Sequence, residues 1–230
     1  LINRRHLSIV MDTFLKWTRS GGHGAAMVKL QHIQGEGPIH HALIEHLHRD
    51  RRCVFELESF TRARFEPAAS ADDYLRDAMT RKHRKEMRRL RHRLDERGRV
   101  SFTVMQPGDA AEQWMDEFLA LEASGWKGRT ETALASHQDD RAFFVESMMA
   151  ALRQDRLRMY ALRLDGRAIA QAVVFVSNDG GFAFKIAYDE SFSDYAPGRQ
   201  LVVDLVRHLH ESRDIAWVDS CAAPDHSMIN

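Results

Sequence analysis

Hydrophobic and polar positions alternate most regularly in the last third of the chain. Residues 157–164, 167–176 and 182–188 each have the pattern of a strand, and the turn sequences DG and NDGG separate them. Glycine in such a turn tolerates the positive φ that a tight hairpin requires. The pattern therefore predicts a meander of three antiparallel strands.

A helix and another strand are expected after the meander. Residues 198–211 have apolar side chains at helical spacing, and residues 215–219 form a short apolar run. The order of antiparallel strands, loop, helix and strand predicts an α/β (α+β) fold. We expect a mixed, mostly antiparallel sheet flanked by helices.

The longest helical pattern covers residues 72–97. Its apolar stripe advances by three or four residues at each step, and Gly98 suits the end of a helix. The pattern predicts one continuous helix. His83 lies inside the stripe, so we expect a core or interface histidine rather than a metal ligand.

The other segments predict a looser alternation of helices and strands. We expect helices at 8–18, 38–48, 110–124 and 139–154, strands at 25–33, 53–65 and 100–105, and a loop at 124–137. We divide the chain into an N-terminal half, 1–106, which contains the long basic helix 72–98, and a C-terminal half, 107–230.

Composition limits the function classes. Apolar residues make up 44% of the chain, enough for a real core, and the net charge of zero predicts no general attraction to nucleic acid or membranes. Cys53 and Cys221 form neither a disulfide framework nor a zinc site. Without an apolar run of membrane-spanning length or a leader, we expect a cytoplasmic protein. Because the chain opens on Leu1 and stops at Asn230, we also expect a fragment.

Charge is distributed unevenly along the chain. Residues 81–99 contain ten lysines or arginines and only three acids. Such a segment favours a phosphate-rich partner, such as a cofactor, an anionic glycan precursor, tRNA or an acidic membrane surface. A solvated helix face explains the pattern equally well. Aromatic residues do not interleave with the basic ones, which weighs against base stacking.

The junction between the last meander strand and the following helix is a candidate phosphate site. A helix N-terminus presents unpaired N–H groups and a partial positive charge. A glycine there lets a ligand approach the backbone, and an arginine adds a charged donor. The alternative is that Pro-Gly merely starts a helix. The residues expected to bind a cofactor are Ala196, Pro197, Gly198, Arg199 and Gln200.

Four stretches together resemble the GNAT superfamily of N-acetyltransferases: RKHRKEMRRLRHRLDERG (81–98), LEASGWKG (121–128), KIAYDE (185–190) and YAPGRQL (195–201). More specifically, they are similar to the cellulose-biosynthesis-associated acetyltransferase group, which is related to FemAB-type transferases. The resemblance implies two GNAT-like halves and an acyltransferase that takes acetyl-CoA or another acyl-CoA as donor, without a metal. The chain departs from the usual GNAT glycine pattern because no second glycine follows Gly198 closely.

Acyl transfer to an amine requires deprotonation of the acceptor, stabilisation of an oxyanion and protonation of the leaving thiolate. Tyr188 ends a strand at the mouth of the expected donor site and could protonate the thiolate. Asp189 or Glu190 could act as the base. Lys185 is expected to pair with Asp219, in a catalytic or a structural role. The alternatives are a tyrosine that completes an apolar face and acids in a solvated loop.

Two pairs are candidates for substrate binding. Trp126 and Lys127 lie in a glycine-flanked loop and suit a sugar, peptide or nucleotide, although the tryptophan could instead plug the core. Asp225 and His226 follow the last strand and could act as base and orienting residue, or be ordinary surface residues.

These observations predict transfer of an acyl group from a small-molecule acyl donor, acyl-CoA, to an amine or hydroxyl. The expected acceptor is a sugar, a glycan precursor or an amino compound in polysaccharide or cell-envelope metabolism. One alternative is a FemAB-like transferase, for which the donor is aminoacyl-tRNA. Another is a non-enzymatic module that binds polyanions or nucleic acid, and a third is a degenerate GNAT fold with a structural role.

Overall fold

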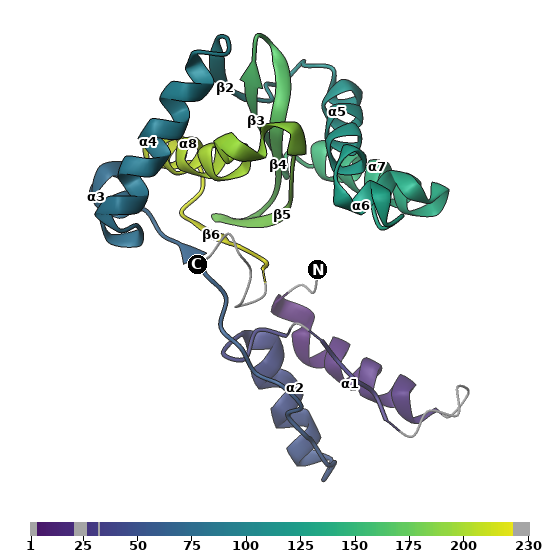
Figure 1. Ribbon diagram of the computed structural model, residues 1–230. Coiled ribbons are helices and arrows are strands. Elements are labelled where there is room, and N and C mark those ends of the chain that lie inside the picture. Colours follow the sequence, from purple (N-terminus) through teal and green to yellow (C-terminus); the bar gives the residue numbers. More distant parts are fainter. Residues whose placement is uncertain (1–3, 21–26, 32, 223–230) are drawn as a thin grey trace. The chain divides into compact units, whose positions relative to one another are not determined.

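The computed structural model describes residues 4–20, 27–31 and 33–222. The chain forms two compact units, which comprise residues 1–59 and residues 60–230 (Figure 1). In the part of the chain that is described, no helix is long and apolar enough to cross a membrane.

The first unit is built on two helices, α1 (Leu7–Arg19) and α2 (Pro38–Arg49), with a short 3-10 turn, η1 (Arg4–His6), before them. Apolar side chains from both helices pack together, namely Met11, Leu15 and Leu43. The predicted helices 8–18 and 38–48 are therefore confirmed within two residues at each end. Arg49 Nη2 also donates to Asp12 Oδ1 over 2.6 Å and connects the two helices at their surface.

Two predicted strands are wrong. Of residues 25–33, the described ones (27–31 and 33) form no strand, and of residues 53–65 only β1 (Arg64–Phe65) is one. A strand is defined by its hydrogen bonds to a neighbour, and among the described residues the segment 53–63 forms no ladder, with a single bond at its end, from the Ser220 amide to the Ala63 carbonyl over 3.0 Å. Its apolar side chains are correspondingly exposed, among them Phe55 and Leu57. Alternation along the sequence indicated the extended backbone but could not supply the partner.

A six-stranded sheet forms the centre of the second unit. It consists of β1, β2 (Val100–Val104), β3 (Leu157–Leu164), β4 (Arg167–Ser177), β5 (Gly180–Tyr188) and β6 (Trp217–Asp219), in the order β1-β6-β5-β4-β3-β2. All neighbouring strands are antiparallel except β5 and β6, which are parallel. This sheet, flanked by helices, confirms the predicted fold class and the predicted meander.

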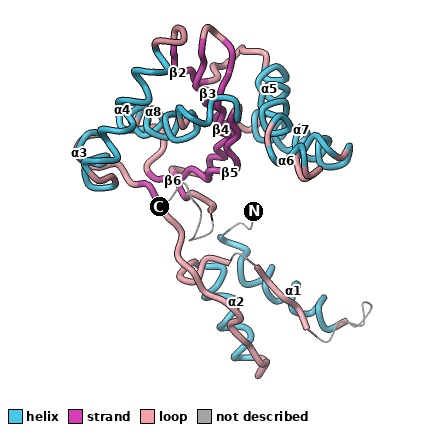
Figure 2. Tube along the Cα trace, in the orientation of Figure 1, coloured by secondary structure: helices cyan, strands magenta, loops and turns pink. Residues whose placement is uncertain are grey.

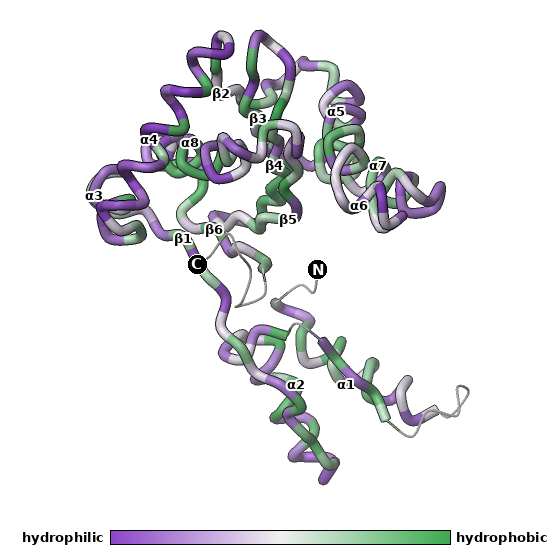
Figure 3. The backbone as a smooth tube through the Cα atoms, viewed as in Figure 1, coloured by the Kyte–Doolittle hydropathy of each residue, from purple (hydrophilic) through white to green (hydrophobic). Residues whose placement is uncertain are grey.

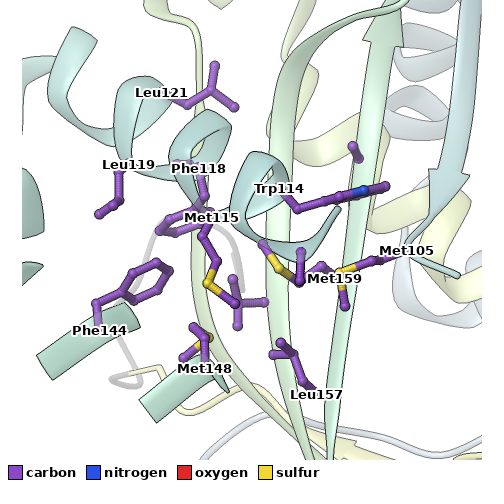
Figure 4. Packing of buried hydrophobic residues seen from close by; sticks show 14 of the residues in the cluster. Met105, Trp114, Met115, Phe118, Leu119, Leu121, Phe144, Met148, Leu157 and Met159 are labelled. Atoms are coloured by element: carbon purple, nitrogen blue, oxygen red, sulfur yellow. The ribbon is translucent and has the colours of Figure 1, made fainter. Parts of the chain in front are cut away.

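Helices cover both faces of the sheet (Figure 2). One face carries α5 (Ala111–Ser124), α6 (Trp126–Arg129), the 3-10 turn η2 (Leu134–Ser136) and α7 (Gln138–Leu152). Its core includes Phe118, Phe144, Met148 and Met159, all of which are buried (Figure 4). The predicted loop 124–137 thus contains two short helical turns.

The other face carries α3 (Ala71–Ala78), α4 (Arg81–Asp95) and α8 (Pro197–Ser212), with Leu94, Ile169 and Leu201 in its core. Figure 3 shows the hydrophobic stretches along the central strands, whereas α4 is mostly hydrophilic. Only a narrow seam of α4, made by Met87, Leu90 and Leu94, is buried. The charged residues of this helix are therefore available for other contacts.

The predicted continuous helix 72–97 is wrong, because the helix is interrupted at Met79 and Thr80, between α3 and α4. Met79 is extended (φ −132°, ψ 136°), and the Thr80 side chain accepts a hydrogen bond from the His83 amide over 3.2 Å. Threonine favours such an N-cap over the interior of a helix because its oxygen competes for backbone N–H groups. The Arg84 side chain then donates to the carbonyls of Arg76 and Met79, and so satisfies backbone acceptors at the C-terminal end of α3.

Strands from both sides of residue 106 belong to one sheet, since β2 pairs with β3. Their paired residues run from Val100 opposite Leu164 to Val104 opposite Tyr160. The boundary between the compact units falls instead between Ser59 and Phe60. The division into two GNAT-like halves, 1–106 and 107–230, stays a prediction.

We predict that Leu201→Ala lowers the free energy of unfolding by about 2–5 kcal/mol, because Leu201 lies on the buried face of α8 and its truncation leaves a cavity. The neighbouring Val202 is 36% exposed, so Val202→Ala should cost less than about 1 kcal/mol. Urea denaturation of both variants measures the difference. Equal losses would contradict the assignment of this face of α8 to the core.

Candidate functional site

Strands β5 and β6 run together for three residue pairs and then part. Gly180, Gly181 and Phe182 pair with Trp217, Val218 and Asp219. A side chain at Gly180 would overlap the Trp217 ring, with a Cβ only 2.1 Å from it, so glycine is what lets β6 approach here. Residues 183–188 pair with β4 on one side, and no described strand occupies the other side. The backbone of β5 therefore has an open edge.

An irregularity in β5 changes the direction of its side chains. Val173 lies opposite Lys185 but Val174 lies opposite Ala183, so Phe184 is an extra residue. Simple alternation would send Phe184 and Lys185 to opposite faces. With the bulge, Phe184 packs into the α5 side of the core and Lys185 also reaches α5.

Glu122 of α5 is the group that Lys185 reaches. Lys185 Nζ donates to Glu122 Oε1 over 2.7 Å, Lys127 Nζ donates to the same oxygen over 3.0 Å, and the Leu134 amide donates to Oε2 over 2.8 Å. The Glu122 side chain is only 2% exposed. Burial acts to raise the pKa of this carboxyl, but the hydrogen bonds from Lys185, Leu134 and Lys127 prevail and lower it. Glu122 is thus held as a carboxylate.

The expected pairing of Lys185 with Asp219 is wrong. The bulge turns Lys185 toward α5, whereas Asp219 Oδ1 accepts the Cys221 amide over 2.7 Å and Oδ2 lies 3.8 Å from Arg62 Nη1. Asp219 also lies opposite Phe182, where the two strands still pair. The sequence reasoning missed Glu122, although a lysine facing the core requires a buried acid and Glu122 belongs to the quoted stretch 121–128.

Tyr188 and Asp189 mark the end of β5. The Tyr188 side chain is partly exposed there. The Asp189 carboxylate is buried and accepts hydrogen bonds from the Ser191 amide over 3.0 Å, from Ser191 Oγ over 2.6 Å and from Arg167 Nη2 over 2.5 Å. Asp189 therefore caps the 3-10 turn η3 (Glu190–Tyr195). Its role as a base, like that of Tyr188 as an acid, stays a prediction.

Glu190 brings the loop with Trp126 to the end of β5. Its carboxylate accepts the Trp126 amide over 2.7 Å and Arg129 Nη2 over 2.7 Å, and these two bonds lower the pKa of the carboxyl. The Trp126 side chain is 56% exposed, so it does not plug the core. Lys127 lies beside it, with Nζ 6.0 Å from the ring centre. The structure therefore brings Trp126 and Lys127 together with Lys185, through Glu122 and Glu190.

The predicted cofactor loop begins α8. Ala196 has a left-handed backbone (φ 49°, ψ 52°), which costs an alanine roughly 1 kcal/mol. Pro197 and the buried Gly198 follow, and the first intrahelical donor is the Gln200 amide, which bonds to the Ala196 carbonyl over 3.0 Å. The amides before it point beyond the helix end.

Two side chains of this loop contact its surroundings. The buried Gln200 donates through Nε2 to the Tyr195 carbonyl over 2.8 Å and accepts from Arg91 Nη1 over 3.4 Å. Arg199 Nη1 lies 3.4 Å from His83 Nε2, so His83 is a contact between α4 and α8. The loop is thus fixed to α4.

Asp225 and His226 lie outside the described residues. Within the described ranges, no group of three or more histidine, cysteine, aspartate or glutamate residues could hold a metal ion.

A family model described as an acetyltransferase (GNAT) domain matches residues 81–226. No curated protein matches the chain. Among solved structures, FemX is similar over 98% of this chain and 71% of its own, with a TM-score of 0.55 and 11% identity, which shows a shared fold. A conserved protein of unknown function from Bacteroides thetaiotaomicron VPI-5482 aligns with 68% of this chain at a TM-score of 0.45 and 14% identity. The chain spans about half, 52%, of that protein.

We predict that Glu122→Ala lowers the free energy of unfolding by roughly 3 kcal/mol, because two ammonium groups lose their buried partner. Glu112→Ala on the same helix, at an exposed position, is the control and should cost less than about 1 kcal/mol. Similar losses in both variants would show that the two lysines do not depend on Glu122.

Glu122→Gln supplies the pH test. Because the folded-state pKa of Glu122 is lowered, its contribution to stability is present above the ordinary carboxyl pKa and is lost as the pH falls through the lowered value. The stability difference between the parent and Glu122→Gln should therefore shrink on acidification. A difference that is constant from neutral to strongly acidic pH would contradict this.

Proposed function

The chain belongs to the acetyltransferase (GNAT) domain family, whose model matches well over half of it, and we propose that it transfers an acyl group from acyl-CoA to an amine or hydroxyl. The observation that carries this proposal is the open edge of β5 beside the N-terminus of α8. Both features suit parts of the same donor.

An open strand edge binds extended chains that carry amides, because its free N–H and C=O groups continue the ladder. The pantetheine arm of coenzyme A is such a chain. Its diphosphate suits a helix N-terminus, where amide N–H groups and the helix dipole favour negative charge. We assign donor binding to residues 196–200, with the backbone at Gly198 as the point of closest approach.

Direct attack by the acceptor fits this chain better than a covalent enzyme intermediate. Partial desolvation and the neighbouring Asp219 carboxylate raise the pKa of the Cys221 thiol, which disfavours the thiolate. The acceptor nitrogen or oxygen would form the bond to the acyl carbon as the carbon–sulfur bond breaks. The acceptor would release its proton to solvent. Tyr188 would donate a proton to the leaving sulfur and regain one from solvent, so no net proton is lost from the enzyme.

We assign Lys185 to the oxyanion. Its ammonium is held by Glu122, so its position is fixed before the reaction, which is what electrostatic stabilisation requires. Asp189 we assign to holding the loop, since its carboxylate already accepts three hydrogen bonds.

The exposed Trp126 beside Lys127 suits an acceptor with a sugar ring or an amino group. By the resemblance to the cellulose-biosynthesis-associated group, we propose a glycan precursor or amino compound of polysaccharide or cell-envelope metabolism. Since acyl-CoA is an intracellular donor, we propose that the reaction takes place in the cytoplasm.

A second candidate is aminoacyl transfer from charged tRNA, as in FemAB-type transferases. The fold shared with FemX over nearly the whole chain and the basic residues of α4 favour it. It differs from the first candidate in its donor, so donor binding separates the two.

We predict that acetyl-CoA or a longer acyl-CoA binds the parent and that Gly198→Glu weakens this binding by at least about tenfold, since a carboxylate would occupy the anion site. Gly35→Glu introduces the same side chain where a Cβ meets nothing within 4 Å, and it should bind like the parent. Calorimetry measures all three proteins. If none of them binds an acyl-CoA while the parent binds tRNA, the second candidate replaces the first.

We predict that Tyr188→Phe lowers kcat by about 100-fold and leaves acyl-CoA affinity unchanged, as for loss of a general acid. Release of free thiol in the presence of a panel of amino sugars and amines measures the rate. Tyr74→Phe, a tyrosine packed beside Phe65, is the control. A rate equal to that of the parent would remove Tyr188 from the mechanism.

A further inference from the structure

A cavity of about 620 Å³ lies between α3, α4 and α8. Sites for small molecules have volumes of roughly 300–1,000 Å³, so its size fits a small ligand. Its lining contains six arginines and three aspartates, a strongly basic balance. We call it the arginine cavity, after Arg76, Arg81, Arg84, Arg88, Arg91 and Arg207.

Four of these arginines form a stripe on α4. Arg81, Arg84, Arg88 and Arg91 are spaced by three, four and three residues, which places them on one face of the helix. Like charges at such spacings destabilise a helix by about 0.2–0.5 kcal/mol per pair. The stability of the helix itself therefore does not explain this arrangement of four arginines, and contacts outside the helix must do so.

Part of the stripe has a structural reason. Arg84 donates to carbonyls at the end of α3, including that of Arg76 over 2.8 Å. Arg91 Nη1 donates to Asp204 Oδ2 over 2.7 Å, and Arg207 Nη1 donates to Asp204 Oδ1 over 3.4 Å. These contacts connect α4 to α3 and α8.

Arg81 and Arg88 have no such reason. Both are exposed, and neither guanidinium group has a hydrogen bond or ion pair with another described residue. They are seven residues apart, which corresponds to a rise of about 10.5 Å along the helix. Two long side chains that start this far apart on one helix face can each bind one phosphate group of a diphosphate or of a bisphosphate, and arginine pairs with phosphate through two parallel hydrogen bonds.

We propose that the arginine cavity binds a small molecule that carries a diphosphate or two phosphate groups, with Arg81 and Arg88 as its charged donors. The lining contains no tryptophan, tyrosine or phenylalanine on which a nucleic-acid base could stack. Walls from three helices also favour a compact ligand over a polymer. Of the predicted donor loop, only Gln200 takes part in the lining, so the cavity is a second anion site beside that loop.

The test is calorimetry with inorganic diphosphate as the probe. The double variant Arg81→Gln/Arg88→Gln should bind at least about tenfold more weakly than the parent, which is the equivalent of one charge-assisted hydrogen bond. The control Lys82→Gln/Lys85→Gln removes the same charge from the same helix at exposed positions outside the cavity, and it should stay within about twofold of the parent. Circular dichroism should show unchanged helix content in both.

Four outcomes would overturn the proposal. The parent could fail to bind diphosphate, or both double variants could lose affinity equally, which would indicate general attraction to the helix. Coenzyme A could weaken diphosphate binding without limit as its concentration rises, as a competitor does, rather than by a factor that levels off, and this would place the probe in the donor loop. A short RNA that binds more tightly than diphosphate, with equal losses in both variants, would also count against it, as a nucleic-acid surface. If coenzyme A does not bind at all while diphosphate does, the proposed donor fails and the arginine cavity stands.

Discussion

The buried carboxylate of Glu122 is the interaction on which the candidate site depends. It joins four segments, since it lies on α5 and accepts hydrogen bonds from β5, from α6 and from the start of η2. A buried charge is costly to isolate, so each of these segments is held to the others by the penalty for leaving the carboxylate or its lysines unpaired. Replacing Glu122 by an apolar residue would keep the volume but release Lys185 and Lys127.

The bulge in β5 is what makes this interaction possible. Without the extra residue, Phe184 and Lys185 could not both turn toward α5. Beyond the bulge, β5 keeps β4 as a neighbour but has left β6, and the chain then enters η3. That turn is held from two sides, by Glu190 on the α6 side and by Tyr195, whose hydroxyl accepts from Arg97 over 3.2 Å. A site framed in this way is supported by rigid elements, which is what precise positioning of substrates requires.

Local patterns predicted the elements that local forces determine. The two hairpins of the meander and the helices predicted at 198–211 and 139–154 follow from turn residues and periodicity, and they are confirmed within two residues at each end. The break at Thr80 also had a local signal, a threonine followed by a charged helix, but the continuous apolar stripe obscured it. The sequence could not show that most of the segment 53–65 lacks a partner strand, because pairing needs a neighbour that the segment itself does not contain. It also could not show the partner of Lys185, because the bulge shifts the alternation by one residue. Both depend on contacts between distant parts of the chain.

Helix α4 shows how a chain of zero net charge can still carry a strongly basic surface. Burial of Met87, Leu90 and Leu94 contributes about 2 kcal/mol each, several times the few tenths lost to each like-charged pair on the exposed face. The seam therefore holds the helix in place whatever its outer face carries. The Arg91–Asp204 pair adds a polar contact to α8, and Asp204 is only 13% exposed. Gln200 connects the donor loop to the arginine cavity. Its side chain donates to the Tyr195 carbonyl before the loop and accepts from Arg91, which lines the cavity. An anion that draws Arg91 away from Gln200 would loosen that loop, and by linkage a ligand that orders the loop would alter affinity in the cavity by the same factor.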